Sequence, residues 1–303
     1  MNSNDDTLVP QMRVLGFVLF CIIAIPSLVF SDTQPFWPDN GWTTDGPFYA
    51  GLSSQVADAV FQNPSYMGGV KKSQIAVYGT SASWGYGSFK LGAVYPLSFA
   101  TIGVGYSVFS SLDNVATQRS SLTNRIESGG TFEHSFRHLS ISGAVPLPHK
   151  WCVSMSIDYL SQVLQSQQAT VFGADFGCVW RPDEHYWIGI ATKQLLQTSL
   201  VWSGSQVQER SPTQYVLEAG LSVPLGWVSA TYDGSYTRLA GGWYVHTMCL
   251  INADIIQSDS QLMRCAIGTQ LDCGSFLLAY RKKIGLQQDL AMDQDQLGVV
   301  FRL

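Results

Sequence analysis

Several residues that could bind a metal or act in catalysis lie on segments with an alternating pattern. His134 and His138 are four residues apart, the spacing at which two ligands share one face of a helix. Their segment alternates like a strand, where this spacing separates two side chains by about 13 Å, too far to share one metal ion. Ser154, Ser156 and Asp158 share a face of the next segment, but that segment has no histidine to serve as a base. These residues do not predict an active site.

Other signals for catalysis and for nucleic-acid binding are missing from the sequence. It contains no GxSxG, Walker or HExxH motif, so we expect no enzyme, no cofactor and no metal. The net charge is −5 and there is no basic block, so nucleic acid is not an expected partner. The cysteines are scattered without a CxxC pair. They are interpreted as small strand residues, with a disulfide between Cys265 and Cys273 as the alternative.

The elements that carry these residues have a period of two. The stretch FATIGVGYSVFS (99–110) alternates apolar residues with glycine, serine and threonine, and similar segments follow to the C-terminus. Charged residues make up only 13% of the chain, about half the usual share. The face opposite the apolar one carries small residues and single charges, which are Lys90, Asp158, Asp175, Glu218, Asp233, Arg264, Arg281 and Arg302. A soluble sheet would carry many Lys and Glu residues there, so the pattern predicts apolar side chains against lipid and charges in a lumen.

The fold class predicted is therefore all-β, a transmembrane antiparallel β-barrel. Thirteen alternating segments can be marked, and because bacterial single-chain barrels have even strand numbers we expect 12–14, with 14 preferred. The missing strand is placed at 198–206. Five tight turns alternate with longer polar loops, which are predicted at 110–130, 198–213, 234–241, 253–260 and 284–294. Aromatic residues near the segment ends, Trp187, Trp202 and Trp227 among them, predict interfacial girdles.

Residues 1–31 read as a cleaved signal peptide. An apolar run over Val14–Ile25 is too short for an ordinary transmembrane helix. Val29 and Ser31 suit the −3 and −1 positions of a cleavage site. Met12 is an alternative start, because acidic residues precede it where positive charge is expected. The protein is predicted to be exported to the outer membrane of a diderm bacterium.

Residues 32–72 form a separate segment ahead of the barrel, which is assigned to 73–303. Within it, apolar residues at roughly helical spacing predict a short helix that Pro64 ends at about Gln62. A barrel whose lumen is lined by glycine has room for such a segment inside. We therefore expect a small, partly helical lumenal plug at the N-terminus.

This segment resembles the FadL/PorV-type outer-membrane proteins, including their spirochaete group. The matching residues are Gly51, Ala57-Asp58-Ala59, Phe61 and Asn63-Pro64-Ser65, followed by a barrel. The sequence departs from the pattern at Ser65, where alanine is usual, and at its terminal Leu303, where many barrels end in phenylalanine. The resemblance implies a 14-stranded barrel with an N-terminal hatch, in which Asp58, Phe61, Asn63, Pro64 and Ser65 would lie on the moving part. The alternative is that Asn63-Pro64 only ends a helix and leads into the first strand.

The function that the resemblance implies is uptake of hydrophobic small molecules, above all long-chain fatty acids, through a gate formed by the hatch. The expected partners are such a ligand, outer-membrane lipid and the barrel-assembly machinery. The loop 110–130 and the stretch 195–205 are candidates for ligand capture, the second because of Leu195, Leu196, Leu200, Val201 and Trp202. Two rivals remain. One is a PorV-like surface-anchoring or secretion-partner barrel without nutrient transport, and the other is a soluble secreted β-sandwich.

Overall fold

The computed structural model describes most of the chain after residue 56. The described residues are 57–82, 86–119, 126–164, 167–183, 185–198, 200–203, 208–209, 213–234, 236–258, 261–285 and 294–303. The predicted signal peptide, residues 32–56 of the predicted plug, Gly51 and the side chain of Asp58 lie outside them.

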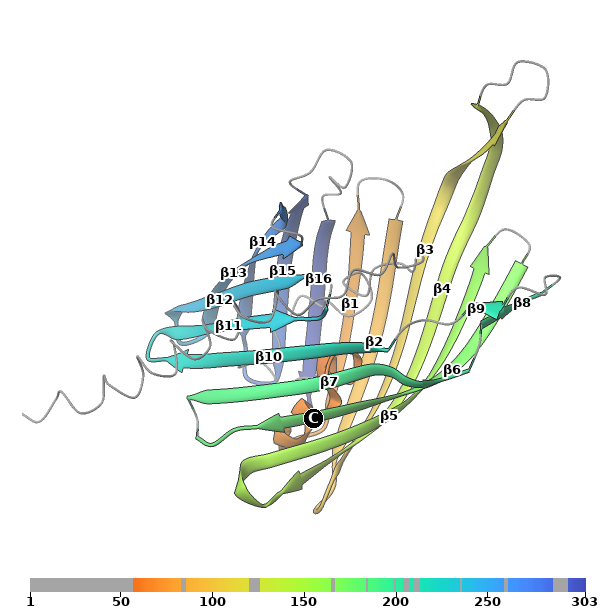
Figure 1. Ribbon diagram of the computed structural model, residues 1–303. Coiled ribbons are helices and arrows are strands. Elements are labelled where there is room, and N and C mark those ends of the chain that lie inside the picture. Colours follow the sequence, from red (N-terminus) through yellow and green to blue (C-terminus); the bar gives the residue numbers. More distant parts are fainter. Residues whose placement is uncertain are drawn as a thin grey trace, which may run out of the picture.

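One antiparallel sheet accounts for nearly all of the described structure (Figure 1). Each ring strand pairs with its neighbours, and β1 pairs with β16 from Gln74 opposite Arg302 to Ala82 opposite Gln294, which closes the sheet. In the described part of the chain the closed ring contains fourteen strands, β1 to β7 followed by β10 to β16. The prediction of a 14-stranded antiparallel barrel is thus confirmed.

The ring strands follow one another in chain order with only β8 and β9 set aside from the ring. The first seven are β1 (Gln74–Ala82), β2 (Tyr86–Pro96), β3 (Thr101–Arg119), β4 (Ile126–Leu147), β5 (Trp151–Leu164), β6 (Gln167–Trp180) and β7 (Tyr186–Gln197). The other seven are β10 (Gln214–Val223), β11 (Gly226–Tyr232), β12 (Thr237–His246), β13 (Cys249–Ser258), β14 (Gln261–Asp272), β15 (Phe276–Gly285) and β16 (Gln294–Arg302). The short 3₁₀ helix η4 (Pro148–Lys150) makes the turn between β4 and β5.

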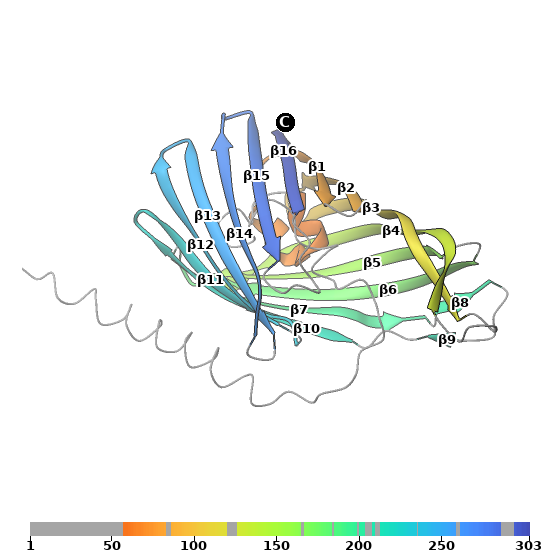
Figure 2. The ribbon, with the colours of Figure 1, turned by 90° about the horizontal axis from the view of Figure 1, so that it is seen from above.

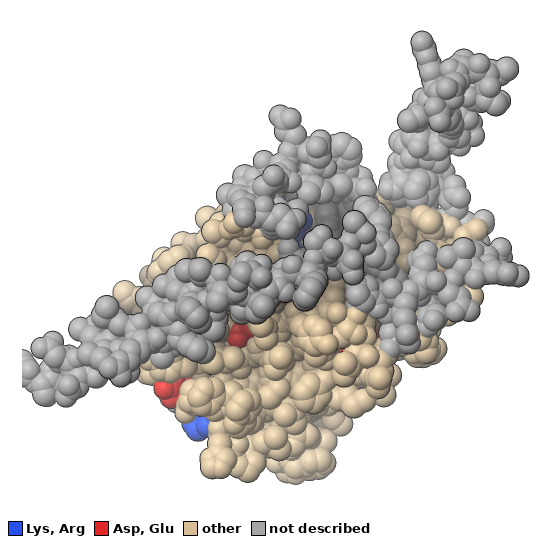
Figure 3. Space-filling view, in the orientation of Figure 1, with Lys and Arg blue, Asp and Glu red and all other residues tan. Residues whose placement is uncertain are grey.

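The two faces of the sheet differ as the alternation predicted. On β3 the residues Ile102, Val104 and Tyr106 are exposed on the outside, whereas Gly103 and Gly105 alternate with them on the inside. Figure 3 shows an outer surface on which charged atoms are sparse. An apolar exterior around a closed sheet is what a lipid environment requires, because every backbone polar group in the bilayer core needs a partner within the protein.

The missing strand was predicted in the wrong place. Residues 200–202 form only the short β8 (Leu200–Trp202), which pairs with β6 and with β9 (Gln208–Glu209). The strand that the count of thirteen lacks is one of the pair β12 and β13, which are joined by the two-residue turn Thr247–Met248 between His246 and Cys249. The predicted loops 234–241 and 253–260 consequently belong largely to strands. With this pair restored, the five predicted tight turns all lie at the same end of the barrel.

The hairpin of β3 and β4 is much longer than its neighbours. At about 3.3 Å per residue, 19 and 22 residues exceed what a tilted strand needs to cross the hydrocarbon core. The two strands stay paired out to Arg119 opposite Ile126, and Figure 1 shows them rising beyond the rest of the barrel. Much of the predicted loop 110–130 is therefore a projecting hairpin.

Three of the aromatic residues assigned to interfacial girdles face inward instead. Trp187 and Trp227 are buried, and each lies over an inner glycine of the neighbouring strand, Gly220 and Gly242 respectively. Trp202 packs on a cluster of inner side chains. The described cysteines, Cys265 and Cys273 among them, are all free thiols.

No helix in the described residues has the length and hydrophobicity that a membrane-crossing helix needs. Nor does that part of the chain contain a group of three His, Cys, Asp or Glu side chains arranged to hold a metal ion.

The outward apolar row gives a direct test of the membrane placement. Ile157 is exposed near the middle of β5, and Leu147 is exposed at the very end of β4. Ile157→Arg should lower the free energy of unfolding in lipid vesicles by about 2–4 kcal/mol, and Leu147→Arg by about 0–1 kcal/mol. Denaturant titration of the two variants measures the difference. Equal effects at both positions would contradict this placement.

Candidate functional site

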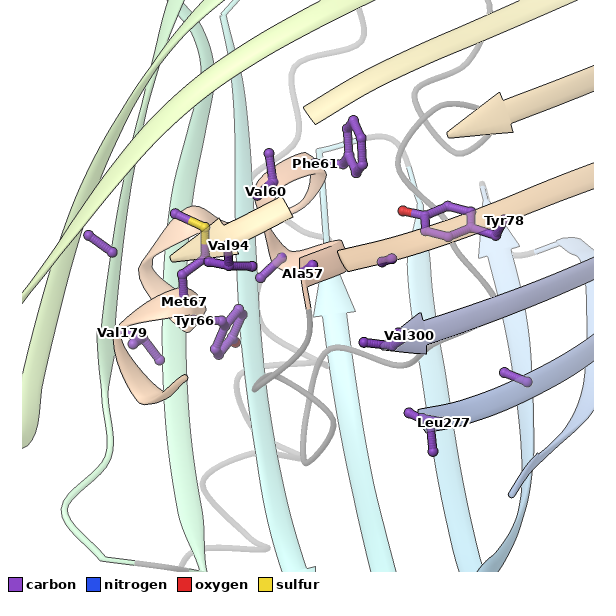
Figure 4. Packing of buried hydrophobic residues seen from close by; sticks show 14 of the residues in the cluster. Ala57, Val60, Phe61, Tyr66, Met67, Tyr78, Val94, Val179, Leu277 and Val300 are labelled. Atoms are coloured by element: carbon purple, nitrogen blue, oxygen red, sulfur yellow. The ribbon is translucent and has the colours of Figure 1, made fainter. Parts of the chain in front are cut away.

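Two 3₁₀ helices, η2 (Ala57–Phe61) and η3 (Pro64–Gly69), lie inside the ring of strands (Figure 2). They contact the inner faces of β1 to β6. Their apolar side chains are almost wholly buried, and they join inward residues of several strands in one cluster (Figure 4). The segment Ala57–Val70, called the plug segment below, is therefore held by the barrel wall.

Asn63 sets the local shape of the plug segment. Its side-chain Oδ1 accepts hydrogen bonds from the backbone N and the Oγ of Ser65, at 3.1 and 2.5 Å, which caps the start of η3. Pro64 occupies the first turn, where its missing N–H costs nothing. The helical turn η2 ends at Phe61, before Pro64, and a second helix, η3, lies between Asn63-Pro64 and the first strand.

Glycines of the barrel wall make room for the plug segment. A Cβ at Gly92 would lie 2.8 Å from the carbonyl oxygen of Ala57, and one at Gly105 would lie 2.6 Å from Val60 and 2.7 Å from Phe61. Contacts this short cannot be relieved where backbone or packed side chains are involved. The glycine-rich inner face predicted from the sequence is thus the seat of the plug segment.

Polar contacts reach the plug segment from the far strands. The Tyr66 hydroxyl donates to Glu218 Oε2 on β10 at 2.7 Å, and Trp187 Nε1 on β7 donates to the other oxygen at 3.4 Å. Burial, reinforced by the Glu218 carboxylate, raises the pKa of Tyr66 well above its ordinary value, so the hydroxyl remains a donor. The Arg181 guanidinium lies 5.3 Å from the centre of the Tyr66 ring.

A second set of polar contacts holds the end of η2. Lys193 Nζ on β7 donates to the carbonyl oxygen of Phe61 at 2.8 Å and lies 3.7 Å from Asp175 on β6. The Asn63 side-chain Nδ2 donates to the carbonyl oxygen of Ile190 at 3.4 Å. Together with the Tyr66 bond, these contacts tie the plug segment to the neighbouring strands β7 and β10.

The register also brings together two residues that the sequence left apart. His138 on β4 lies 2.7 Å from Asp158 on β5, and Ser156 Oγ donates to the other Asp158 oxygen at 3.0 Å. The serine and the histidine both contact the carboxylate rather than each other, so the nucleophile–base contact of a catalytic triad is not formed. His134 faces the same lumen but bonds to Gln162 at 2.9 Å.

A separate apolar cluster lines the lumen on the long-loop side of the plug segment. On β3 the plug segment touches Gly103 and Gly105, and the cluster begins farther along, at Phe109. Its members come from four adjacent strands, and they are Phe109, Phe136, Leu160, Ala169 and Val171, with Trp202 of β8 packed on them. We call these six residues the inner apolar cluster. Apolar side chains that face a lumen offer a surface to a hydrophobic ligand.

Comparison with solved structures places this architecture among known barrels. The toluene transporter TbuX of Ralstonia pickettii matches with a TM-score of 0.60 and 12% identity, over 82% of this chain and 94% of that one. The toluene transporter TodX of Pseudomonas putida gives 0.58 and 11%, over 80% and 91%. A Pseudomonas aeruginosa FadL homologue gives 0.55 and 10%, over 90% and 99%. The fold is that of the FadL-type outer-membrane barrels.

This likeness confirms, at the level of the fold, the resemblance drawn from the N-terminal residues. TbuX and TodX are transporters by description, and the FadL-type fold fits placement in the outer membrane. No family model matches the sequence. No curated protein matches it either.

The residues predicted for the hatch and for capture differ in placement. Phe61, Asn63, Pro64 and Ser65 are buried against the barrel wall. Among the predicted capture residues, Trp202 packs on the inner apolar cluster, whereas Leu195, Leu196 and Val201 are exposed, and the side chain of Leu200 lies outside the described residues. Sequence reasoning missed Phe109, Phe136, Leu160 and Val171. Each is a single apolar residue on the inner row of its strand, and one such residue does not mark a site in the sequence of that strand alone.

The predicted lumenal charges lie on or beside the inner row. Lys90, Asp158 and Arg281 are buried, and Asp175, Glu218 and Arg264 are partly buried on the same face. Asp233 follows the end of β11, and Arg302 at the tight-turn end forms an ion pair with Asp272 at 2.8 Å. The first six charges therefore line the interior, and Asp233 and Arg302 lie at its two ends.

Filling the glycine seat should dislodge the plug segment. Gly105→Val places atoms within the space of Val60 and Phe61 and should destabilise the seated state by about 1–3 kcal/mol. Gly143→Val is the control, because a side chain there meets nothing within 4 Å. Limited proteolysis of the folded barrel should cut the plug segment faster in the first variant alone. Equal resistance in both would contradict the seat.

Proposed function

We propose that the protein takes up hydrophobic small molecules through the outer membrane. The observation that carries the proposal is the inner apolar cluster, which gathers apolar groups from four strands on the inner wall, apart from the cluster that holds the plug segment. An apolar surface inside a membrane barrel has no role in keeping the barrel in lipid, whereas it lowers the free energy of a hydrophobic solute that leaves water. The similarity of the fold to TodX and TbuX, which are described as toluene transporters, supports the same class of ligand.

Long-chain fatty acids are the ligands we propose within this class. The fold likeness to a FadL homologue and the N-terminal residues shared with FadL-type proteins support this choice. Exposed Leu195, Leu196 and Val201 near the open end of β7 and β8 would make the first contact, and Trp202 would pass the chain to the inner apolar cluster. Each step transfers apolar area from water to protein.

The plug segment is proposed to act as the hatch. It crosses the lumen between the inner apolar cluster and the tight-turn end, so a ligand moving along the barrel would meet it. The hydrogen bonds that hold it are few and separate: the Tyr66–Glu218 and Lys193–Phe61 bonds, and the bond from the side chain of Asn63. They contribute about 0.5–1.5 kcal/mol each, and the apolar contacts of the segment with the wall can be replaced by a ligand that itself offers an apolar surface.

A reversible cross-link between the plug segment and the barrel tests the hatch. A Cβ at Gly68 would lie 3.4 Å from the Cβ of Cys152 on β5, close to the separation found in disulfides. Oxidised Gly68→Cys should form this bond and abolish uptake of a fluorescent long-chain fatty acid into proteoliposomes. Reduction should restore it.

The control is Gly68→Ser, which has nearly the same volume and no thiol, and which should transport equally under both conditions. Unchanged uptake by the cross-linked protein would contradict the hatch. If folded wild-type protein neither binds nor transports the fatty acid, uptake itself is refuted and the anchoring or secretion-partner role gains support.

A further inference from the structure

The inner wall formed by β13 to β16 differs from the wall that carries the inner apolar cluster. The two walls stand on opposite sides of the ring, because β3 to β6 and β13 to β16 are separated in both directions by other strands (Figure 2). Inward positions of β13 to β16 carry polar side chains at most levels, and these are Asn252, Asp254, Gln270, Arg281, Lys283, Gln294 and Gln296. We call this set the amide wall.

Three carboxamides of the amide wall are buried without partners. Asn252 is fully buried, yet neither its Nδ2 nor its Oδ1 has a hydrogen-bond partner. Gln270 Nε2 and Gln294 Nε2 also lack a hydrogen-bond partner, and the two residues are 5% and 2% exposed, respectively. A buried amide without a partner costs about 1–3 kcal/mol of stability. Three such amides on one wall are therefore costly unless another molecule forms hydrogen bonds with them.

Register places two of these amides on neighbouring strands. Asn252 of β13 is opposite Gly268 of β14, and Gln270 is one inward position beyond Gly268. The Asn252 side chain leans over Gly268, where a Cβ would lie 2.5 Å from its Oδ1. Asn252 and Gln270 are therefore diagonal neighbours on the inner face. Gln294 lies apart from them on β16, opposite Lys283.

The carboxylate of this wall is already engaged. Asp254 pairs with Arg281, and Arg238 on β12 reaches the same carboxylate at 3.0 Å. What Asn252 and Gln270 offer is neutral hydrogen bonding, with a donor from each amide and an acceptor from Asn252. A hydrocarbon would leave all of these atoms unpaired, and a carboxylate, which only accepts, would leave the Asn252 oxygen unpaired.

We propose that the amide wall binds a neutral, hydroxylated head group, so that the ligand carries an apolar chain ending in a polyol such as glycerol. Hydroxyl groups both donate and accept, which matches the unpaired atoms of Asn252 and Gln270. The inference rests on the proposed uptake function and deepens it, because the fatty chain proposed there would be bound preferentially as a neutral ester.

The test compares three ligands that share one ten-carbon chain. Decane, decanoate and the glycerol monoester of decanoate would each displace a fluorescent hydrophobic probe from the protein in lipid nanodiscs, where no sugar detergent competes. The monoester should bind about tenfold or more tightly than decane, from one or two additional hydrogen bonds. Asn252→Leu should remove most of that preference and leave the affinity for decane unchanged.

Two further variants make the result decisive. Gln270→Leu removes the neighbouring amide on β14 and should act in the same direction, should Asn252→Leu fail to fold. Gln257→Leu removes an exposed amide of β13 and should change nothing. If all three ligands bind alike and the variants leave this order unchanged, the amides hold water only and the head-group site is refuted, while uptake stands. If no ligand displaces the probe, uptake and the head-group site are both refuted.

Discussion

The pairing of β1 with β16 is the constraint on which the rest of the structure depends. It joins the first and last strands over nine residue pairs, and beyond its end Leu303 N donates to the Ser73 carbonyl oxygen at 2.8 Å. In lipid an open sheet edge would leave a row of backbone groups unpaired, at several kcal/mol each, so closure decides whether the fold can exist there. Once the ring closes, every second side chain of a strand faces lipid and must be apolar. The other side chains face the lumen, where their types are not restricted by lipid.

The inner wall of the barrel carries different kinds of side chains in different places, and closure of the ring does not by itself explain this. Glycines of β2, β3, β6 and β7 give up side-chain volume so that the plug segment can approach the wall, and Gly92 and Gly105 show how little space is left. Farther along, apolar groups gather around Phe109, whereas the opposite wall carries buried amides and paired charges. The lumen thus has a seat, an apolar side and a polar side, and the proposed uptake of an amphiphilic ligand uses each of them.

The sequence predicted most of the fold because its governing signal is local. Alternation along each strand, with few charges, is visible in a single chain, and it led to a closed barrel with the right number of strands. The β12–β13 turn was missed because Thr247-Met248 lacks the glycine, proline or asparagine that marks most hairpins. The bond between His138 and Asp158, and the inward aim of Trp187, depend on register between strands, which is not encoded in either strand by itself. The contacts of residues 57–70 with β7 and β10 likewise depend on the closed ring.

The central claim is that the plug segment is seated in the lumen and that ligand displaces it. Hydrogen exchange, followed by mass spectrometry on the protein in lipid nanodiscs, measures this most directly, because the backbone amides of Tyr66 and Val70 are hydrogen-bonded within the segment. Peptides covering 57–70 should exchange slowly without ligand and markedly faster at saturating fatty acid, while peptides from β13 to β16 stay protected. Protection of 57–70 that does not change on ligand binding would contradict the account.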